Sequence, residues 1–217
     1  KQERSCHTSA VVIGAGAAGL TAALAIADSG YDVHLIERSD MLGGNLLNIY
    51  YVAEGYNPQR LLRDLVNRVR SHQRITTHRR SEVVRQTGQV GSFQTEIETL
   101  RPDGSAERVT LEHGVTIVAT GGREAQSHPW LALPNVITLR KLEEKIIHHP
   151  EEIAALKDVV IIQCVQLEDG KNYCSRVCCT NTMKNATRIK LMNPSCRVSV
   201  LYKNIVTYGF REAFYTA

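Results

Sequence analysis

The stretch SAVVIGAGAAGLTAALAIADSGYDVHLIE, residues 9–37, decides the fold of this chain. Its first part, SAVVI, is a short apolar run typical of a buried strand, and GAGAAG then turns the chain. LTAALAIADSG is rich in strong helix formers and ends at Gly30, and YDVHLIE has the apolar pattern of a second strand. The sequence therefore predicts a strand, a tight turn, a helix and a second strand.

Three glycines, Gly14, Gly16 and Gly19, form a GxGxxG pattern between the first strand and the helix. Such glycines permit a tight turn, a close approach of the backbone to a pyrophosphate, and close helix–strand packing. Glu37 ends the next strand, where its carboxylate can accept hydrogen bonds from ribose hydroxyls and would repel a 2′-phosphate. We expect a dinucleotide site with the helix amino terminus facing the phosphates, and NADP is disfavoured. The alternative is a glycine-rich turn with no ligand.

The rest of the chain alternates between helical and strand patterns. Residues 58–71 have helical spacing, and from about 75 to 118 the apolar period shortens to two, with a hairpin turn at 102–104. The remaining predicted elements are a short helix at about 139–148, a helix after Pro150, a strand at DVVIIQC, a helix at about 177–191 and a strand at RVSVLY.

This order predicts an α/β fold in which a Rossmann-like dinucleotide-binding unit carries an inserted small antiparallel sheet and is followed by a second, partial Rossmann-like unit. The expected domains are 1–122, with the inserted helix and sheet at about 45–114, then a linker with helices at 123–156, and the second unit at 157–217.

Composition and charge exclude several classes of function. The net charge of +4 is small for 217 residues, and no basic block is interleaved with aromatic residues, so we expect no nucleic-acid binding. The longest apolar runs are too short to span a bilayer, and the first ten residues lack the apolar core of a secretory signal. We therefore expect no transmembrane segment. Six cysteines are too few for a disulfide-rich secreted scaffold, and the clustering of four of them favours a reducing compartment, which predicts a cytoplasmic location.

Four of the six cysteines cluster in the sequence: Cys164, Cys174, Cys178 and Cys179. Adjacent cysteines suit poorly the two separated ligand pairs that are usual for zinc, whereas a [4Fe–4S] cluster tolerates irregular spacing. A redox disulfide and simple packing of small apolar side chains are the other interpretations. The spacing favours an iron–sulfur cluster. Cys6 and Cys196 stand alone, and we expect them to be packing or surface thiols.

The glycine turn is part of a wider pattern. GxGxxG, E-R-x₄-GG at residues 37–44, and a strand ending in ATG together resemble the FAD-binding half of two-dinucleotide-binding flavoproteins. The resemblance implies bound FAD, with Arg38 flanking the adenine or the phosphates unless it is a solvated charge. It implies this set of cofactor-binding residues: Gly14, Gly16, Ala17, Ala18, Gly19, Glu37, Arg38, Gly43, Gly44, Asn45, Ala119, Thr120 and Gly121. The glycine–aspartate segment that holds the ribityl chain in those proteins is not found before Ala217, which indicates a fragment or an unusually open flavin site.

The cysteine region carries a second resemblance. VVIIQCVQLEDGKNYCSRVCCTNTMKNA, followed by NIVTYGFREAFYTA, is similar to the A-type subunit of heterodisulfide reductase and its FAD-containing relatives. In that family such cysteines bind a [4Fe–4S] cluster near the FAD, and the flavin splits electron pairs between two acceptors. The resemblance implies that the four clustered cysteines are ligands. GGNLLNIYYVAEG and VATGGRE fit a branch without the inserted ferredoxin module, and C-x₂-C-x₂-C motifs are absent.

These observations predict an oxidoreductase: an electron-transferring flavoprotein module that passes electrons between FAD and a [4Fe–4S] cluster. The resemblance implies partners that are other redox subunits of a multi-subunit complex, in which a homodimer is one arrangement, and electron bifurcation is a further implication. Two alternatives remain: a thioredoxin-reductase-like thiol/disulfide flavoenzyme, and a non-catalytic module that binds a nucleotide or zinc to fold. No acid–base catalytic residue can be named from the sequence.

Overall fold

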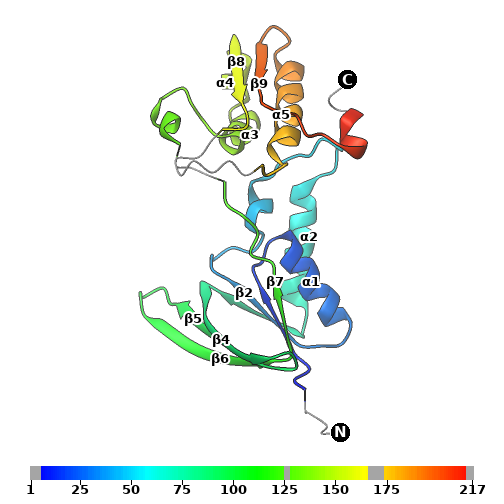
Figure 1. The fold of residues 1–217 in the computed structure, drawn as a ribbon, viewed down its shortest axis with the longest axis vertical. Coiled ribbons are helices and arrows are strands. Elements are labelled where there is room, and N and C mark those ends of the chain that lie inside the picture. Colours follow the sequence, from blue (N-terminus) through cyan, green and yellow to red (C-terminus); the bar gives the residue numbers. More distant parts are fainter. Residues whose placement is uncertain (1–5, 125–127, 166–173, 214–217) are drawn as a thin grey trace. The chain divides into compact units, whose positions relative to one another are not determined.

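The computed structural model describes residues 6–124, 128–165 and 174–213 (Figure 1). Contacts divide the chain into two compact units, one made of residues 1–47 with 59–123 and the other of 48–58 with 124–217. The three predicted domain ranges stay a prediction, since they are statements about independent folding. Within the described ranges, no helix is long and apolar enough to cross a membrane.

The first unit is built on a parallel sheet with the strand order β3-β2-β1-β7. Its strands are β1 (Ala10–Ile13), β2 (Val33–Glu37), β3 (Ile75–Arg79) and β7 (Val115–Val118). Helix α1 (Ala17–Asp28) connects β1 to β2, so that Ala10 pairs with Val33 and Ile13 with Ile36. This arrangement confirms the strand, turn, helix and strand predicted for residues 9–37.

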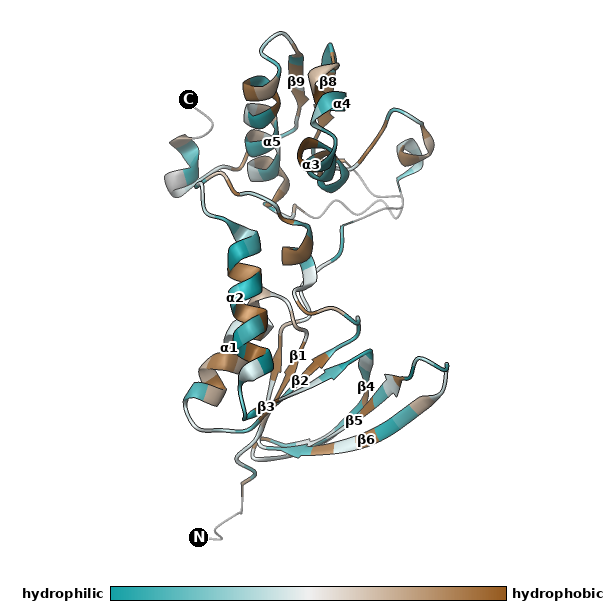
Figure 2. Cartoon of the chain, turned by 180° about the vertical axis from the view of Figure 1, so that it is seen from behind, coloured by the Kyte–Doolittle hydropathy of each residue, from teal (hydrophilic) through white to brown (hydrophobic). Residues whose placement is uncertain are grey.

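Two helices, α1 and α2 (Pro58–Ser71), cover one face of this sheet (Figure 1). Leu20 of α1 and Val69 of α2 pack with Leu35 of β2 in one apolar core, and each of these side chains is at most 1% exposed. Burying a side chain of this size contributes roughly 1.5–3 kcal/mol. Helix α2 alternates between apolar and polar residues along its length (Figure 2), which is why its helical period is visible in the sequence.

The inserted antiparallel sheet lies on the opposite face of the parallel sheet. It comprises β4 (Ser81–Gln89), β5 (Ser92–Leu100) and β6 (Ala106–His113), in that order. Ile97 and Leu111 pack with Val11 and Ile36 in a second core. The strand pattern at residues 75–79 lies within the range predicted for the insertion, and the structure places it as β3, which pairs with β2 in the parallel sheet.

The second unit contains a strand–helix–strand arrangement in which β8 (Asp158–Ile162) and β9 (Arg197–Leu201) pair in parallel through helix α5 (Cys178–Met192). Helices α3 (Leu139–His148) and α4 (Pro150–Ala154) also belong to this unit. Ile146, Ile153 and Ile189 form its core together with Cys196. The predicted second Rossmann-like unit is therefore confirmed, and it contains these two strands within the described residues. Short 3-10 helices are η1 (Gly44–Asn48), η2 (Pro129–Ala132) and η3 (Gly209–Glu212).

The segment 48–58 belongs to the second unit through a network of buried polar groups. Glu143 of α3 and Lys184 of α5 form an ion pair of 2.7 Å, and each side chain is only 5% exposed. Glu143 also accepts a hydrogen bond from the Tyr50 N–H at 2.8 Å, and Lys184 donates one to the Tyr51 carbonyl at 2.9 Å. The Tyr51 hydroxyl lies 2.6 Å from the Asn185 amide oxygen, and burial raises the pKa of this phenol. Each buried charge therefore has a charged partner and a backbone partner.

Candidate dinucleotide and cysteine sites

The glycine turn follows β1 and leads into α1, at the carboxyl edge of the parallel sheet. Gly14 has φ +101°, and a Cβ there would lie 2.5 Å from the Ala119 carbonyl oxygen. A Cβ on Gly19 would lie 1.8 Å from the Gly14 carbonyl oxygen. Both neighbours are backbone atoms that cannot rotate away, so the packing of the fold itself requires glycine at these two positions.

Gly16 differs from the other two glycines of the motif. No heavy atom lies within 4 Å of the position that its Cβ would take, and its φ of −75° is open to any residue. Gly16 is also the N-cap of α1, and the exposed Ala17 and Ala18 follow it in the first helical turn. The first N–H groups of a helix have no intrahelical partner and carry the positive end of its dipole. The open position beside Gly16, next to these N–H groups, suits the approach of a diphosphate.

A second glycine pair closes one side of this space. Gly43 donates its N–H to the Ala15 carbonyl at 2.7 Å and forms an isolated parallel bridge with Gly16. Gly44 has φ +52°, and a Cβ there would lie 3.0 Å from the Gly16 Cα. The structure thus brings Gly43 and Gly44 directly against the glycine turn, as the spacing E-R-x₄-GG predicts.

The loop after β7 reaches the same edge. The Asn45 side-chain amide donates to the Gly122 carbonyl at 2.8 Å, which ties the loop after β2 to the loop after β7. Ala119 is half-buried against Gly14, and Thr120 and Gly121 are exposed. Of the predicted cofactor residues, those after β1, β2 and β7 therefore meet at one edge of one sheet, where open α/β sheets bind their ligands.

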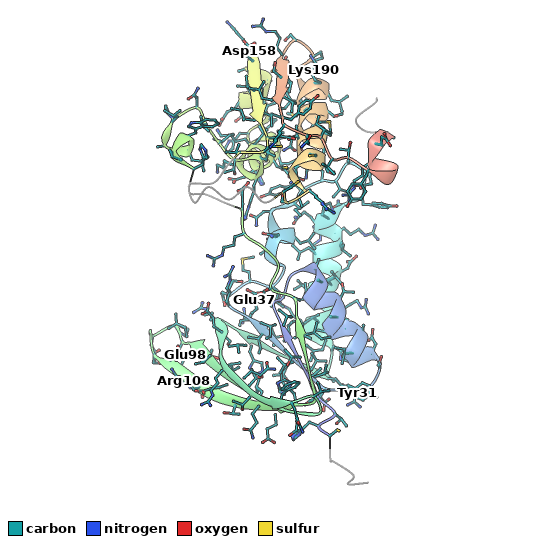
Figure 3. The ribbon with its side chains drawn as sticks, viewed as in Figure 1. Tyr31, Glu37, Glu98, Arg108, Asp158 and Lys190 are labelled. Carbon is teal, nitrogen blue, oxygen red and sulfur yellow. The ribbon has the colours of Figure 1, made fainter. Side chains whose placement is uncertain are left out.

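Glu37 lies at the carboxyl end of β2 and is only 8% exposed (Figure 3). Its Oε2 accepts from the Ala15 N–H at 2.8 Å, and its Oε1 accepts from the N–H and hydroxyl of Ser39 at 2.9 and 2.8 Å. A carboxylate has about four acceptor positions, so Oε2 retains capacity for a ribose hydroxyl. The side chain of Arg38 is exposed, in keeping with either a phosphate contact or a solvated charge. The residues present therefore fit a dinucleotide without a 2′-phosphate.

The cysteines lie in the second unit, around the amino end of α5. Cys164, two residues beyond β8, has φ +55°, and its thiol lies 3.7 Å from the Asn204 carbonyl. Cys179 is 1% exposed; its sulfur lies 4.0 Å from the same carbonyl and accepts the Val206 N–H at 3.3 Å. Cys164 and Cys179, separated by fourteen residues of sequence, are thus brought to one backbone segment.

The surroundings of two of the thiols shift their pKa values in opposite directions. Burial raises the pKa of the Cys178 thiol, and the adjacent Cys179 and, more weakly, Cys164 raise it further. Hydrogen bonding with the backbone of Asn204 and Lys203 lowers the pKa of the Cys164 thiol. The fourth predicted ligand, Cys174, is exposed, and residues 166–173 before it lie outside the described part of the chain.

The sulfurs do not form the close set that one metal ion requires. Among the residues that the structure describes, the one group of three ligand atoms within 4.8 Å of one another is the exposed His149, Glu151 and Glu152. In a [4Fe–4S] cluster each thiolate binds a different corner of a cube, so its sulfurs stand further apart than those around a single ion. The cysteine ligand set therefore stays a prediction.

Sequence reasoning did not predict that residues 203–206 contact Cys164 and Cys179. They act through backbone N–H and C=O groups, which every residue type except proline provides in full, so no side-chain pattern could reveal them. Cys196, expected to be a packing thiol, is fully buried in the core of the second unit, and Cys6 is exposed.

The fold and the glycine turn at the carboxyl edge of a parallel sheet are those of the dinucleotide-binding class of α/β proteins. Residues 8–162 match the family model described as pyridine nucleotide-disulphide oxidoreductase, and the chain belongs to this family. The expected oxidoreductase class is thereby confirmed.

The chain is similar to the A-type subunits of heterodisulfide reductases, which confirms the resemblance found in the sequence. It is 24% identical to the A-type subunit of the ferredoxin:CoB-CoM heterodisulfide reductase of Methanosarcina acetivorans, over 96% of this chain and 41% of the relative. It is also 24% identical to the A-type iron-sulfur subunit of the CoB–CoM heterodisulfide reductase of Methanocaldococcus jannaschii, over 95% of this chain and 44% of the relative. The chain spans less than half the length of these relatives.

Two further comparisons concern insertions and fold. The alignment with the Methanosarcina acetivorans protein runs over 335 residues, more than the 217 of this chain, so that relative has inserted residues which this chain lacks. Among solved structures, L-proline dehydrogenase from P. horikoshii superposes with a TM-score of 0.54 at 15% identity, over 97% of this chain and 39% of that one. This likeness concerns the fold alone.

Proposed function

We propose that this chain is the part of an electron-transferring flavoprotein that holds FAD in its first unit and a [4Fe–4S] cluster in its second. The observation that carries the proposal is the meeting of the Cys164 and Cys179 thiols at the Asn204 carbonyl, with Cys178 adjacent to Cys179 in the sequence. In a second nucleotide-binding unit a glycine turn would stand at this place, and the sequence has none there. Bound FAD exchanges electrons in pairs or singly, whereas a cluster passes single electrons.

The residues of the first unit would bind and orient the flavin nucleotide. The helix end at Gly16 would hold the diphosphate through backbone N–H groups, and Glu37 would accept from the ribose. Gly43 and Gly44 would let the chain pass close to the diphosphate. Asn45 would fix the loop after β7 beside the cofactor through its bond to Gly122.

The second unit would supply four thiolates, from Cys164, Cys174, Cys178 and Cys179. Such ligands must stay reduced, so a cytoplasmic setting is part of the proposal. We infer further that the chain works among other redox subunits, because its relatives are named as subunits of larger reductases. Bifurcation is the finer hypothesis: a Methanococcus maripaludis relative, 33% identical over 52% of this chain, is named for both a heterodisulfide and ferredoxin.

The test is to measure flavin, iron and sulfide in the anaerobically purified full-length protein. We expect one FAD and about four iron and four sulfide per chain. Cys179→Ala should lose iron and sulfide, whereas the matched control Cys196→Ala should keep both, since each replaces a buried cysteine of the same unit.

Other results would overturn the proposal. Protein that contains flavin but no iron, and whose thiols form a reducible disulfide, would support the thioredoxin-reductase-like alternative. Fully folded protein without flavin would support a non-catalytic module. Equal iron content in Cys179→Ala and wild type would remove Cys179 from the ligand set.

A further inference from the structure

Residues 203–206 follow β9 and bring backbone groups to the cysteine sulfurs. The Val206 N–H points at the Cys179 sulfur at 3.3 Å, and the Asn204 carbonyl lies 3.7 Å from the Cys164 sulfur and 4.0 Å from that of Cys179. One backbone donor is therefore aimed at the Cys179 sulfur, and one backbone acceptor lies near the sulfurs of both Cys164 and Cys179.

The contact at Cys179 is shielded from water. Cys179 is 1% exposed and Val206 is half-buried, so solvent competes little for the sulfur. In such surroundings a hydrogen bond is electrostatically stronger than in water. The N–H belongs to the backbone that follows β9.

An N–H group aimed at a ligand sulfur has a definite effect on a cluster. Reduction adds one negative charge, part of which lies on the thiolate sulfurs, and hydrogen bonds to those sulfurs are one of the factors that set the potential. A donor stabilises the more negative, reduced state more than the oxidised state, and hydrogen bonds to charged acceptors are the stronger ones. The potential of the cluster therefore rises with each such donor.

We propose that Val206 is a positioning residue whose backbone N–H, through Cys179, raises the reduction potential of the iron–sulfur cluster. The inference rests on the proposed function, since it presupposes the cluster. It adds a residue outside the ligand set, on the segment after β9, and assigns the effect to the peptide group rather than to the valine side chain.

The experiment compares variants of the iron-loaded, full-length protein in which the N–H is removed or kept. Val206→Pro removes it, and Val206→Ala keeps it while shortening the side chain. A third variant replaces Val206 by its α-hydroxy acid, so that an ester oxygen stands in place of the N–H with the side chain unchanged. The midpoint potential of the cluster is measured by anaerobic redox titration, followed by electron paramagnetic resonance.

We expect a more negative midpoint potential in the proline and ester variants, an unchanged potential in Val206→Ala, and wild-type iron content in the ester variant. If the proline variant fails to fold, the ester variant decides. An unchanged potential in an ester variant with a full cluster overturns this inference and leaves the proposed function standing. Wild-type protein without iron overturns both.

Discussion

Gly16 and Gly19 stand three residues apart in one motif, and alanine at each should have opposite consequences. At Gly16 an added Cβ meets no atom within 4 Å, and the φ of −75° suits alanine. At Gly19 the same Cβ would lie 1.8 Å from the Gly14 carbonyl oxygen. Gly16→Ala should therefore impair dinucleotide binding and spare the fold, whereas Gly19→Ala should damage the fold.

The magnitudes follow from these surroundings. Gly16→Ala removes a favourable N-cap residue, which lowers the free energy of unfolding, and it also reduces the entropy of the unfolded chain, which raises it. Each effect amounts to at most about 1 kcal/mol, so the two nearly cancel. Its methyl group would stand where a diphosphate must approach, and the loss of one charge-assisted hydrogen bond, roughly 1.5–3 kcal/mol, weakens binding at least about tenfold. Gly19→Ala should lower the free energy of unfolding by about 3 kcal/mol or more, since backbone must shift.

The assay pairs urea unfolding with titration of FAD into the flavin-free protein, for wild type and both variants. Each variant is the control for the other, because both add one methyl group to the same turn. Wild-type FAD affinity in Gly16→Ala would refute the placement of the diphosphate at Gly16. Wild-type stability in Gly19→Ala would refute the packing argument for the third glycine.

Three further predictions concern buried polar groups. Lys184→Met should lower the free energy of unfolding by roughly 3–5 kcal/mol, because it leaves the Glu143 carboxylate buried without its charged partner. The double variant with Glu143→Leu should recover much of this stability. Urea unfolding measures both. The Nδ1 atom of His34 lies 3.1 Å from the Nε2 atom of His78, and burial lowers the pKa of both imidazoles below 6.5. The unfolded state therefore binds protons at a higher pH than the folded state does. The contribution of the two histidines to the free energy of unfolding should be complete above pH 6.5 and should fall as the pH drops toward the folded-state pKa values. His78→Phe should flatten this pH dependence of stability. Glu37→Gln should weaken FAD binding about tenfold or more, because a neutral acceptor for the ribose replaces a charged one. Fluorescence titration measures this affinity. An unchanged affinity would exclude Glu37 from the site.

The elements of the first unit are predictable from sequence because several signals agree there. Apolar runs, a glycine turn and a strong helix former follow one another in residues 9–37, and each has a local cause. The strand at 75–79 lies in a different sheet from the predicted one. The sequence could not show this, because an apolar period of two indicates that side chains alternate between two faces and does not indicate which strand pairs with this one. Pairing partners lie far apart in the sequence, as β2 and β3 do.

The sites are predictable to different degrees. Glycines and an acidic residue at the end of a strand predict the candidate dinucleotide site because its proposed contacts depend on their side chains or on the lack of a side chain. The sequence spacing of the cysteines does not show that Cys164 and Cys179 meet at Asn204, which depends on the path of the chain after β9. The assignment of 48–58 to the second unit is equally hidden, since it rests on contacts with Glu143 and Lys184.

The chain passes between its two units three times, because residues 48–58 leave the first unit and return to it before the final passage near residue 123. A single cut or gene fusion at residue 123 would therefore not yield a self-sufficient second unit. It would strip Tyr50 and Tyr51 from a buried pair of opposite charges. In evolutionary terms, recombination at this one junction should rarely produce a viable product, so the nucleotide-binding and cysteine-bearing units are expected to be inherited together.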